Sequence, residues 1–520
     1  MSTQKKKDNL YLVINLGFRS IRLVLFDETG KKIIHNWYPV KTVMSDGFIE
    51  QDANEWVQKL GMLFSELVNS VPEVKSKLVA ITVTSSAGCL VSVDKEGNPL
   101  HNCILISDTR AEKQAQRMLK NHSAFFDSDD SFLPLASYQL PKIVWFLENN
   151  AQVFENVHKF LSPNDFIIYK LTGKYVTDPL NASKFYYNES DSSHPHAILA
   201  EHKISVDKFP EVKPVGYVVG ELRGDLRKKY GFSRKVVVVQ TTYDALCAFW
   251  GSGVSDEGDA SNVVGTVSSV RVLSGKKIAF KSNLLSQSFS IFGKYIVGGS
   301  NNIDGGVFEW AKGCFYGDSY PEKYIFNIMN DEATRSEIGA RGLCFIPYLL
   351  GERAPFWDPH VRGAFFGLEK FHSRDDIVRS IFESSCFMIK DIMDEIERHG
   401  VVVNTLRMNG GASRLDLLSQ LRADVLNKKV LVLKETESTA LGAFLLMVHA
   451  LGVIPSVKHF SDYVGIDRVY NPNLENHRMY LELFKFFKYL YASTKKVSKK
   501  RHALLSMFKD SGKRYEVENM

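Results

Sequence analysis

The sequence has no long hydrophobic run, no closely spaced cysteine pair and no large excess of charge of one sign. Its six cysteines are scattered and form no C-x-x-C pair, which argues against a zinc site or a disulfide framework and for a reducing compartment. No apolar stretch reaches the roughly 18–20 residues of a membrane-spanning helix. The basic start at residues 4–7 is not followed by the small-residue cleavage site of a secretory signal. We therefore expect a cytoplasmic protein with no membrane partner.

The charge balance also excludes some functions. Lysine and arginine number 65 and aspartate and glutamate 59, so the net charge is +6, and part of it lies in the stretch 495–501 (KKVSKKR). A nucleic-acid-binding protein usually carries a basic stripe through its folded part, and none is visible, so we expect no nucleic acid partner. The basic stretch itself is interpreted either as a patch for an anionic surface or as a solvated tail.

The composition is that of a globular chain, with 44% apolar and 24% charged residues, and the length favours two to four domains. A strand, turn, strand pattern opens the chain at 10–16, 21–26 and 32–34, and is followed by a helix at 54–68 and a strand at 78–84. After the polar stretch 255–261, the run 263–273 repeats the strand, turn, strand plan. The repeat predicts two similar α/β halves with a cleft between them, where substrate and nucleotide would bind.

The two repeated turns are candidate phosphate sites. In the first, Gly17 permits close approach of the backbone, Ser20 offers a hydroxyl and Arg22 a positive charge. Gly265 and Thr266 occupy the corresponding place in the second half. Each turn taken alone is better explained as an ordinary strand-end turn; as a pair they could hold a polyphosphate from both sides.

A third candidate is the small-residue loop after the predicted strand 405–408. Gly410, Gly411, Ala412 and Ser413 open a helix, and no large side chain obstructs the approach of a base, ribose or phosphate. The ordinary alternative is a helix start capped by a serine.

Asp244 follows the apolar strand 235–239 and so lies near the carboxyl end of a strand, where open α/β sheets place their ligands. A carboxylate there can take the proton of a substrate hydroxyl as its oxygen attacks phosphorus. The alternative is a simple N-cap of the helix that follows.

Several motifs appear together in one order along the chain. They are residues 51–56 (QDANEW), 107–110 (SDTR), 163–173 (PNDF…KLTG), 178–183 (DPLNAS), 347–358 (PYLLGERAPFWD) with 362–363 (RG), 410–424 (GGAS…QLRAD) and 437–443 (ESTALGA). Together with Asp244 and the Gly265–Thr266 turn, this order resembles the FGGY family of carbohydrate kinases, over about residues 11–454. The resemblance implies an α/β fold of two actin-like, ribonuclease-H-like ATPase domains flanking a central cleft.

The same resemblance implies domains at 9–254 (sugar-binding) and 260–455 (nucleotide-binding), and a helical extension with a basic tail at 456–520. It implies ATP and Mg²⁺ as cofactors, a small-molecule sugar or polyol as the partner, and leaves a homodimer open. Asp244 is implied as general base and substrate contact, with Asp108 and Arg110 at the sugar site. The nucleotide contacts implied are Gly17, Ser20, Arg22, Gly265, Thr266, Gly410, Gly411, Ala412 and Ser413.

The first phosphate motif departs from the family pattern Asp-x-Gly-Thr-x-Ser-x-Arg/Lys. The acid is Asn15 and the threonine is Phe18. Asparagine keeps an acceptor oxygen but no charge, and hard cations prefer charged oxygen ligands, so Asn15 is expected to be a weak, indirect metal contact. Residues 85–88 (SSAG) replace side chains with which several sugar-kinase branches hold the sugar, so the substrate cannot be inferred from them.

Three hypotheses follow. Asp244, the Gly265–Thr266 turn and the loop at Gly411 favour a working sugar or polyol kinase. Asn15 and Phe18 favour a catalytically impaired relative that binds nucleotide or sugar and acts by closing its cleft. An actin- or chaperone-like ATPase is the third and least favoured, because the sugar-side motifs resemble the kinase family specifically.

Overall fold

A computed structural model describes residues 8–45, 47–127, 133–278, 284–289, 293–317, 320–435 and 437–510. The first seven residues and the last ten residues of the expected basic tail lie outside this part. The chain divides into two compact units. Unit 1 comprises residues 1–255, 288–293 and 437–464, and unit 2 comprises residues 256–287, 294–436 and 465–520.

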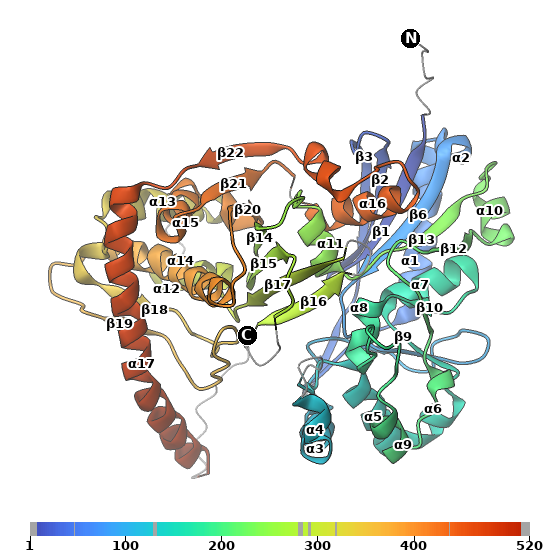
Figure 1. The fold of residues 1–520 in the computed structure, drawn as a ribbon, viewed down its shortest axis with the longest axis horizontal. Helices are drawn as coiled ribbons and strands as arrows, with labels where there is room; N and C mark the ends of the chain where they lie inside the picture. Colours follow the sequence, from blue (N-terminus) through green and yellow to red (C-terminus); the bar gives the residue numbers. More distant parts are fainter. Residues whose placement is uncertain are drawn as a thin grey trace. The chain divides into compact units, whose positions relative to one another are not determined.

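Unit 1 is built on a six-stranded sheet in the order β12-β13-β6-β1-β2-β3 (Figure 1). Strands β1, β2 and β3 form an antiparallel meander, β6 and β13 are parallel to β1 and to each other, and β12 is antiparallel to β13. The strands span Leu10–Leu16 (β1), Ser20–Asp27 (β2), Lys32–Pro39 (β3), Leu78–Ser85 (β6), Val218–Glu221 (β12) and Val237–Gln240 (β13). Every residue of β1 is buried, as expected of a central strand covered on both faces.

The alternation of side chains along β1 sends neighbouring residues to opposite faces. Leu12 and Ile14 pack in a core with Trp56 of α1 (Ala53–Ser70) and Phe166 of α7 (Pro163–Thr172). On the other face, the ring of Tyr11 meets Phe444 of α16 (Ser438–Ala450), with centroids 5.7 Å apart.

The remaining elements of unit 1 are short. They are β4 (Val43–Ser45), β5 (Phe48–Gln51), β7 (Val91–Val93), β8 (Cys103–Ile104), β9 (Lys159–Leu161), β10 (Val176–Thr177), β11 (Glu211–Val212), α2 (Val74–Lys77), α3 (Glu112–Asn121), α4 (Ser123–Phe126), α5 (Gln139–Asn149), α6 (Ala151–Asn156), α8 (Pro179–Ala182), α9 (His196–Glu201), α10 (Gly224–Tyr230) and α11 (Asp244–Trp250).

Helix α16 joins unit 1 although it lies late in the sequence. It packs on α11 so closely that a Cβ on Gly442 would stand 1.7 Å from the Cys247 carbonyl oxygen, and one on Gly251 would stand 1.8 Å from that of Ser438. Two glycines therefore permit direct backbone contact of the two helices. The contacts of residues 437–464 place them in unit 1. The sequence analysis instead divided this stretch between the second predicted domain, 260–455, and the predicted extension, 456–520. Those domain limits stay a prediction.

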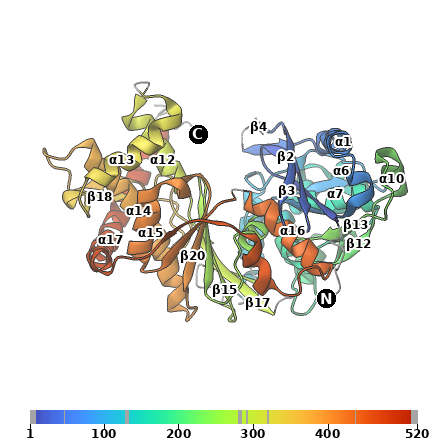
Figure 2. The same ribbon diagram turned by 90° about the horizontal axis from the view of Figure 1, so that it is seen from above.

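Unit 2 repeats the plan of unit 1, with a seven-stranded sheet in the order β16-β17-β15-β14-β20-β21-β22 (Figure 1). Figure 2 shows three of its strands, β15, β17 and β20, from above. Strands β14, β15 and β17 form the antiparallel meander, and β20 and β21 continue parallel to β14. The strands span Asp259–Val264 (β14), Ser268–Ser274 (β15), Leu285–Phe289 (β16), Lys294–Ser300 (β17), Thr405–Asn409 (β20), Lys429–Leu433 (β21) and Ile466–Tyr470 (β22). The repeated order confirms the prediction of two similar α/β halves.

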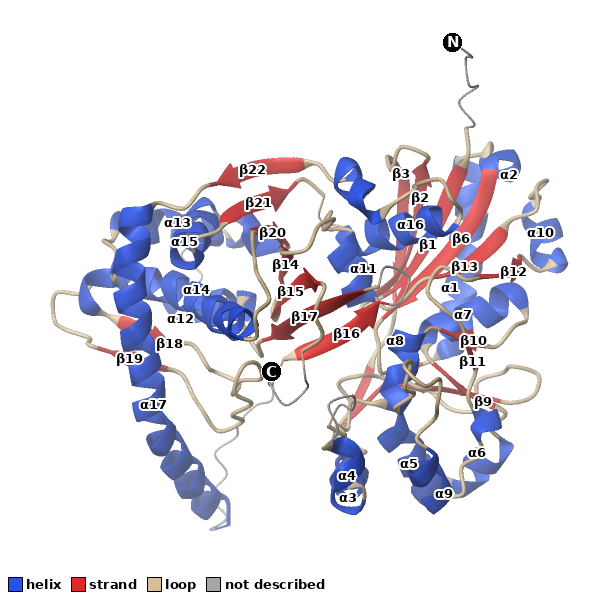
Figure 3. Cartoon of the chain, in the orientation of Figure 1, coloured by secondary structure: helices blue, strands red, loops and turns tan. Residues whose placement is uncertain are grey.

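The helices of unit 2 and its small second sheet lie on one side of the seven-stranded sheet (Figure 3). They are α12 (Gly305–Phe315), α13 (Ile325–Arg335), α14 (Arg374–Arg398), α15 (Asp416–Leu426), α17 (Leu474–Asp510), β18 (Cys344–Ile346) and β19 (Ala364–Phe366). Among the described residues, no helix combines the length and apolarity needed to cross a membrane. The predicted cytoplasmic location stays a prediction.

Candidate active site

Three parallel strands of unit 1 end at the same edge of the sheet. Leu16 of β1 lies beside Ser85 of β6, and Gln240 of β13 lies beside Val83 of the same strand. The chain that leaves these strands carries Gly17, Ser86 and Asp244, so the topology brings the first turn and Asp244 to one edge, as open α/β sheets do with their ligand sites.

Asp244 is the first residue of α11 and is half-buried. The Ser86 hydroxyl donates to its Oδ2 at 3.0 Å. The segment before it is anchored by Thr242, whose hydroxyl donates to Asp178 at 3.0 Å and whose carbonyl accepts from Thr84 at 2.8 Å. Burial raises the pKa of the Asp178 carboxyl to about 6. These hydrogen bonds hold the backbone segment that carries Asp244. The sequence motif did not reveal this anchoring.

The first turn is closed by a bond from the Gly17 amide to the Ser20 carbonyl at 3.0 Å. The Arg22 guanidinium donates to the Ser20 hydroxyl at 2.9 Å and pairs with Glu437 at 3.3 Å. The three residues predicted to contact phosphate are thus gathered in one turn, and the arginine is shared with a carboxylate immediately before α16. A phosphate that binds Arg22 would compete with Glu437.

Asn15 and Phe18 flank this turn. Asn15 lies opposite Arg22 in the β1–β2 pair and is 3% exposed, while Phe18 is 37% exposed. The Phe18 carbonyl accepts from the Gln51 amide at 2.7 Å, so the turn is tied to the residue that begins the QDANEW motif. The phenylalanine ring lines a cavity of about 20 Å³ with Ser86 and Trp56, which is room for about one water molecule.

The donors at this turn suit a magnesium ion poorly. Mg²⁺ is usually held by one or two carboxylates together with substrate phosphates, and Asn15 offers only a neutral oxygen. Within the described part of the chain, no group of three or more histidine, cysteine, aspartate or glutamate residues could hold a metal. Any Mg²⁺ would therefore be held chiefly by the phosphates of the nucleotide.

Asp108 and Arg110 lie away from solvent in a cluster of their own. Arg110 donates to both carboxylate oxygens of Asp108, at 2.9 and 2.8 Å, and to Glu50 at 2.6 Å. The guanidinium also stacks on Phe48, 4.1 Å from the ring centroid. In this arrangement the two side chains hold the loop before α3 to β5, and their predicted role at a sugar site stays a prediction.

Unit 2 contains a cavity of about 290 Å³ that brings both of its predicted loops together. The lining residues, apart from Val264, are Gly265, Thr266, Gly305, Phe308, Glu309, Phe326, Gly411, Ala412 and Leu415. The volume is near the lower limit of small-molecule pockets, about 300 Å³. The aromatic rings and backbone edges of this lining suit a flat base with polar substituents.

The two glycines of the loop, Gly410 and Gly411, have different structural roles. Gly410 has φ +104°, and a Cβ there would stand 2.1 Å from the Val264 carbonyl oxygen, so it permits the close packing of β14 against the loop. A Cβ on Gly411 would meet nothing within 4 Å. Ser413 lies beneath the loop and donates to the Gly410 carbonyl at 2.7 Å. Gly411 and Ala412 thus face the cavity, while Gly410 and Ser413 shape the loop.

Gly411→Leu is expected to weaken ATP binding by at least tenfold, because the side chain would enter the cavity without a backbone collision. Isothermal titration with ATP measures the change. The matched control is Gly224→Leu in unit 1, where a Cβ also meets nothing within 4 Å; it should leave ATP affinity unchanged. Equal affinities of Gly411→Leu and the unaltered protein would show that this cavity does not hold the nucleotide.

The Gly351–Glu352–Arg353 motif contacts the segment that leads into α12. Glu352 accepts from the Asn302 amide at 2.8 Å and from the Arg353 amide at 2.7 Å, and burial raises the pKa of its carboxyl to about 8. Asn301, in turn, accepts from the Ser268 amide at 2.8 Å. The motif therefore fixes the segment between β17 and α12 against the strand that follows the Gly265–Thr266 turn.

Comparison with known proteins agrees with this architecture. The N-terminal domain of the FGGY family of carbohydrate kinases matches residues 10–251, and its C-terminal domain matches residues 260–451. A xylulose kinase of Staphylococcus epidermidis (strain ATCC 35984) is 28% identical over 494 residues, which are 94% of this chain and 97% of that protein. A glycerol kinase of Thermococcus onnurineus (strain NA1) is 26% identical over 90% of this chain and 94% of that protein.

Solved structures show the same fold. The crystal structure of a gluconate kinase from Lactobacillus acidophilus superposes with a TM-score of 0.86 at 23% identity, covering 95% of this chain and 99% of that one. A xylulose kinase from Rhodospirillum rubrum gives a TM-score of 0.87 at 20% identity, covering 94% of this chain and 100% of that one. The predicted family and the two-domain, actin-like α/β fold are confirmed: the chain belongs to the FGGY family of carbohydrate kinases.

Proposed function

We propose that this protein transfers the γ-phosphoryl group of ATP to a hydroxyl of a sugar or polyol, with Asp244 as the general base. The observation that carries the proposal is a carboxylate at the common edge of three parallel strands, held by Ser86 at 3.0 Å and built on a buried, anchored segment. The names of the relatives, xylulose kinase and glycerol kinase, support a polyhydroxylated acceptor.

In the proposed reaction the Asp244 carboxylate accepts the proton of the acceptor hydroxyl as that oxygen bonds to phosphorus. The bond between the γ-phosphorus and the β,γ-bridging oxygen breaks, and ADP leaves. The cavity at Gly265, Thr266 and Gly411 is the proposed place of the nucleotide, and Ser20 and Arg22 are proposed phosphate contacts in unit 1. A bound Mg²⁺ would balance charge on the phosphates.

The test is ATP turnover with a panel of ketoses, aldoses, polyols and sugar acids, with Mg²⁺ and Mn²⁺ compared. We expect ADP release that depends on one class of acceptor and is lost on removal of the divalent ion. No turnover with any acceptor, together with measurable ATP binding, would favour the second candidate function, a binding protein. Asn15 and Phe18 are the observations that favour that alternative.

Asn15→Asp is expected to tighten magnesium-dependent ATP binding and raise turnover, by about 10–100-fold in metal affinity if the carboxylate supports the ion through its waters. Titration of ATP with and without Mg²⁺ measures the first effect, and a coupled ADP assay the second. Phe18→Thr should add to it, and the two changes should couple because both residues lie at one turn.

The matched control is Asn156→Asp on the exposed face of α6, which makes the same charge change far from the turn in sequence and should change neither value. Weaker ATP binding in Asn15→Asp would mean that the turn has adopted a different ligand geometry, in which a new carboxylate repels the phosphates.

A further inference from the structure

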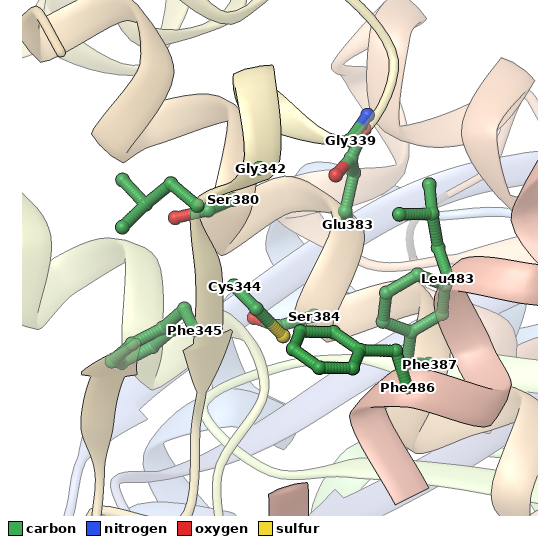
Figure 4. Close-up of a pocket in the computed structure, with 11 residues that line it drawn as sticks. Gly339, Gly342, Cys344, Phe345, Ser380, Glu383, Ser384, Phe387, Leu483 and Phe486 are labelled. Carbon is green, nitrogen blue, oxygen red and sulfur yellow. The ribbon is translucent and has the colours of Figure 1, made fainter. Parts of the chain in front are cut away.

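Helix α17 has two parts with different surroundings. Its first part packs on unit 2: Tyr480 and Phe487 are fully buried, and the Tyr480 hydroxyl donates to Glu383 at 3.0 Å. Figure 4 shows Leu483 and Phe486 of this helix beside Phe387 at a cavity of about 80 Å³. This part of the helix is therefore anchored.

Most side chains of the second part are exposed, although Leu505 is half-buried. Among the side chains that the structure describes, Ser498 is the last buried one in the helix. Beyond it, the rings of His502 and His360 are in contact, with centroids 4.5 Å apart. Residues 499–510 extend about 18 Å at 1.5 Å per residue. The dark red end of α17 in Figure 1 is this segment, which projects past α14 and α15 of the same unit.

Up to Lys509 the charge along this part of α17 is of one sign, and Asp510 follows as the last residue of the helix. From Leu483 to Lys509 the sequence contains no aspartate or glutamate. Five basic side chains are concentrated near its middle and make no ion pair with the described part of the chain; they are Lys495, Lys496, Lys499, Lys500 and Arg501.

Large apolar side chains are exposed between these charges. Val497 is 64% exposed, Leu504 51% and Met507 68%. At 100° per residue, Val497 and Leu504 point within about 20° of one direction, so they lie on one stripe of the helix. Lys500 and Arg501 border that stripe on either side.

We propose that this segment of α17 binds the surface of an anionic lipid bilayer. The apolar stripe would enter the boundary between headgroups and acyl chains while the bordering lysines and Arg501 contact lipid phosphates, as in interfacial helices. A nucleic acid or another soluble polyanion would use the charges but would leave Val497 and Leu504 in water. Residues 495–501 lie within α17, which continues to Asp510. The proposal takes up the first of the two interpretations of this stretch, a patch for an anionic surface, and it differs from the expectation of no membrane partner.

The experiment is co-sedimentation of the full chain with vesicles of phosphatidylcholine alone and with 30% phosphatidylserine. We expect binding to the anionic vesicles that weakens with salt. The triple variant Lys499→Glu, Lys500→Glu and Arg501→Glu should reduce the partition coefficient by about 100-fold or more, since each lost charge is worth roughly fivefold. Val497→Ser with Leu504→Ser, which removes the apolar groups without changing the charge, should reduce it at least tenfold.

The matched control is Lys113→Glu, Lys120→Glu and Lys228→Glu, three exposed lysines of unit 1, which should bind anionic vesicles far better than the α17 triple variant. Equal binding to neutral and anionic vesicles, or none to either, overturns the proposal. So does binding to a single-stranded RNA homopolymer that the α17 triple variant loses but the Val497→Ser, Leu504→Ser variant keeps, because that result assigns the charges to a soluble polyanion. Kinase turnover and melting temperature, measured alongside, verify that each variant is folded.

Discussion

Asp244→Asn is expected to lower phosphoryl transfer by about 10²–10⁴-fold while leaving ATP affinity nearly unchanged. Asparagine has the same shape and can still accept the Ser86 hydroxyl through its amide oxygen, so the 3.0 Å contact and the start of α11 are retained. What is lost is the ability to take a proton from the acceptor hydroxyl. The variant therefore separates chemistry from folding and from nucleotide binding.

The measurement is a coupled ADP assay with the acceptor identified from the panel, together with titration of ATP. Asp225→Asn is the matched control, because Asp225 also stands in the first turn of a helix of unit 1, α10, but is paired on the surface with Arg223 at 3.0 Å. It should keep full activity. Turnover of Asp244→Asn equal to that of the control would exclude the assigned base and leave Asp244 as an N-terminal residue of α11.

The two-unit fold could be predicted because its main signals are local. The pattern of a buried strand, a small turn and a second strand occurs twice in the sequence, at Gly17 and at Gly265. In the structure, the two main sheets repeat the same plan of strands. The two loops of unit 2 were likewise visible as runs of small residues, and Gly265, Thr266, Gly411 and Ala412 do line one cavity.

What could not be predicted depends on contacts between distant segments. The ion pair of Arg22 with Glu437 joins residues 415 positions apart, and no spacing rule would reveal it. Helix α16 follows the strands of unit 2 in sequence but packs on α11 through Gly251 and Gly442, whose role appears only when both backbones are placed. Asp108 and Arg110 show a second limit. Both were noticed in the sequence as polar motif residues, but the sequence did not reveal that they are buried and bind each other.

The remaining residues that line the cavity of unit 2 illustrate the same limit. Phe308 and Phe326 lie on α12 and α13, and in the sequence they look like ordinary core positions of two helices. Without a structure, a cavity residue is recognised only where it belongs to a turn motif with a counterpart elsewhere in the sequence, as Gly265 and Thr266 do.

Arg422→Met is expected to destabilise unit 2 by about 3–5 kcal/mol, because it leaves a buried carboxylate without its partner. Arg422 and Asp304 have fully buried side chains and pair at 2.7 Å, and Arg422 also donates to Ser385 at 3.1 Å and to Asn262. This cluster joins α15, α14 and β14 to the residue before α12.

The position of the cluster couples the stability of unit 2 to the proposed nucleotide cavity. The amide of Asp304 donates to the Thr266 carbonyl at 2.9 Å, and that of Gly305 to the Gly265 carbonyl at 2.9 Å. An uncompensated charge on Asp304 would therefore disturb the turn that lines the cavity. Arg422→Met is expected to weaken ATP binding as well as folding.

Urea unfolding followed by fluorescence measures the stability change, and the double variant Arg422→Met, Asp304→Asn isolates its cause. Removing both charges should cost less than the sum of the two single changes by about 0.5–3 kcal/mol, as expected for directly coupled residues. Arg223→Met is the matched control, since its pair with Asp225 is 45% and 60% exposed at the two side chains and should contribute less than about 1 kcal/mol. If Arg422→Met were no more destabilising than this control, the buried pair would not be what holds α12 against the Gly265–Thr266 turn, and the apolar core around Phe308 and Phe382 would have to do so alone.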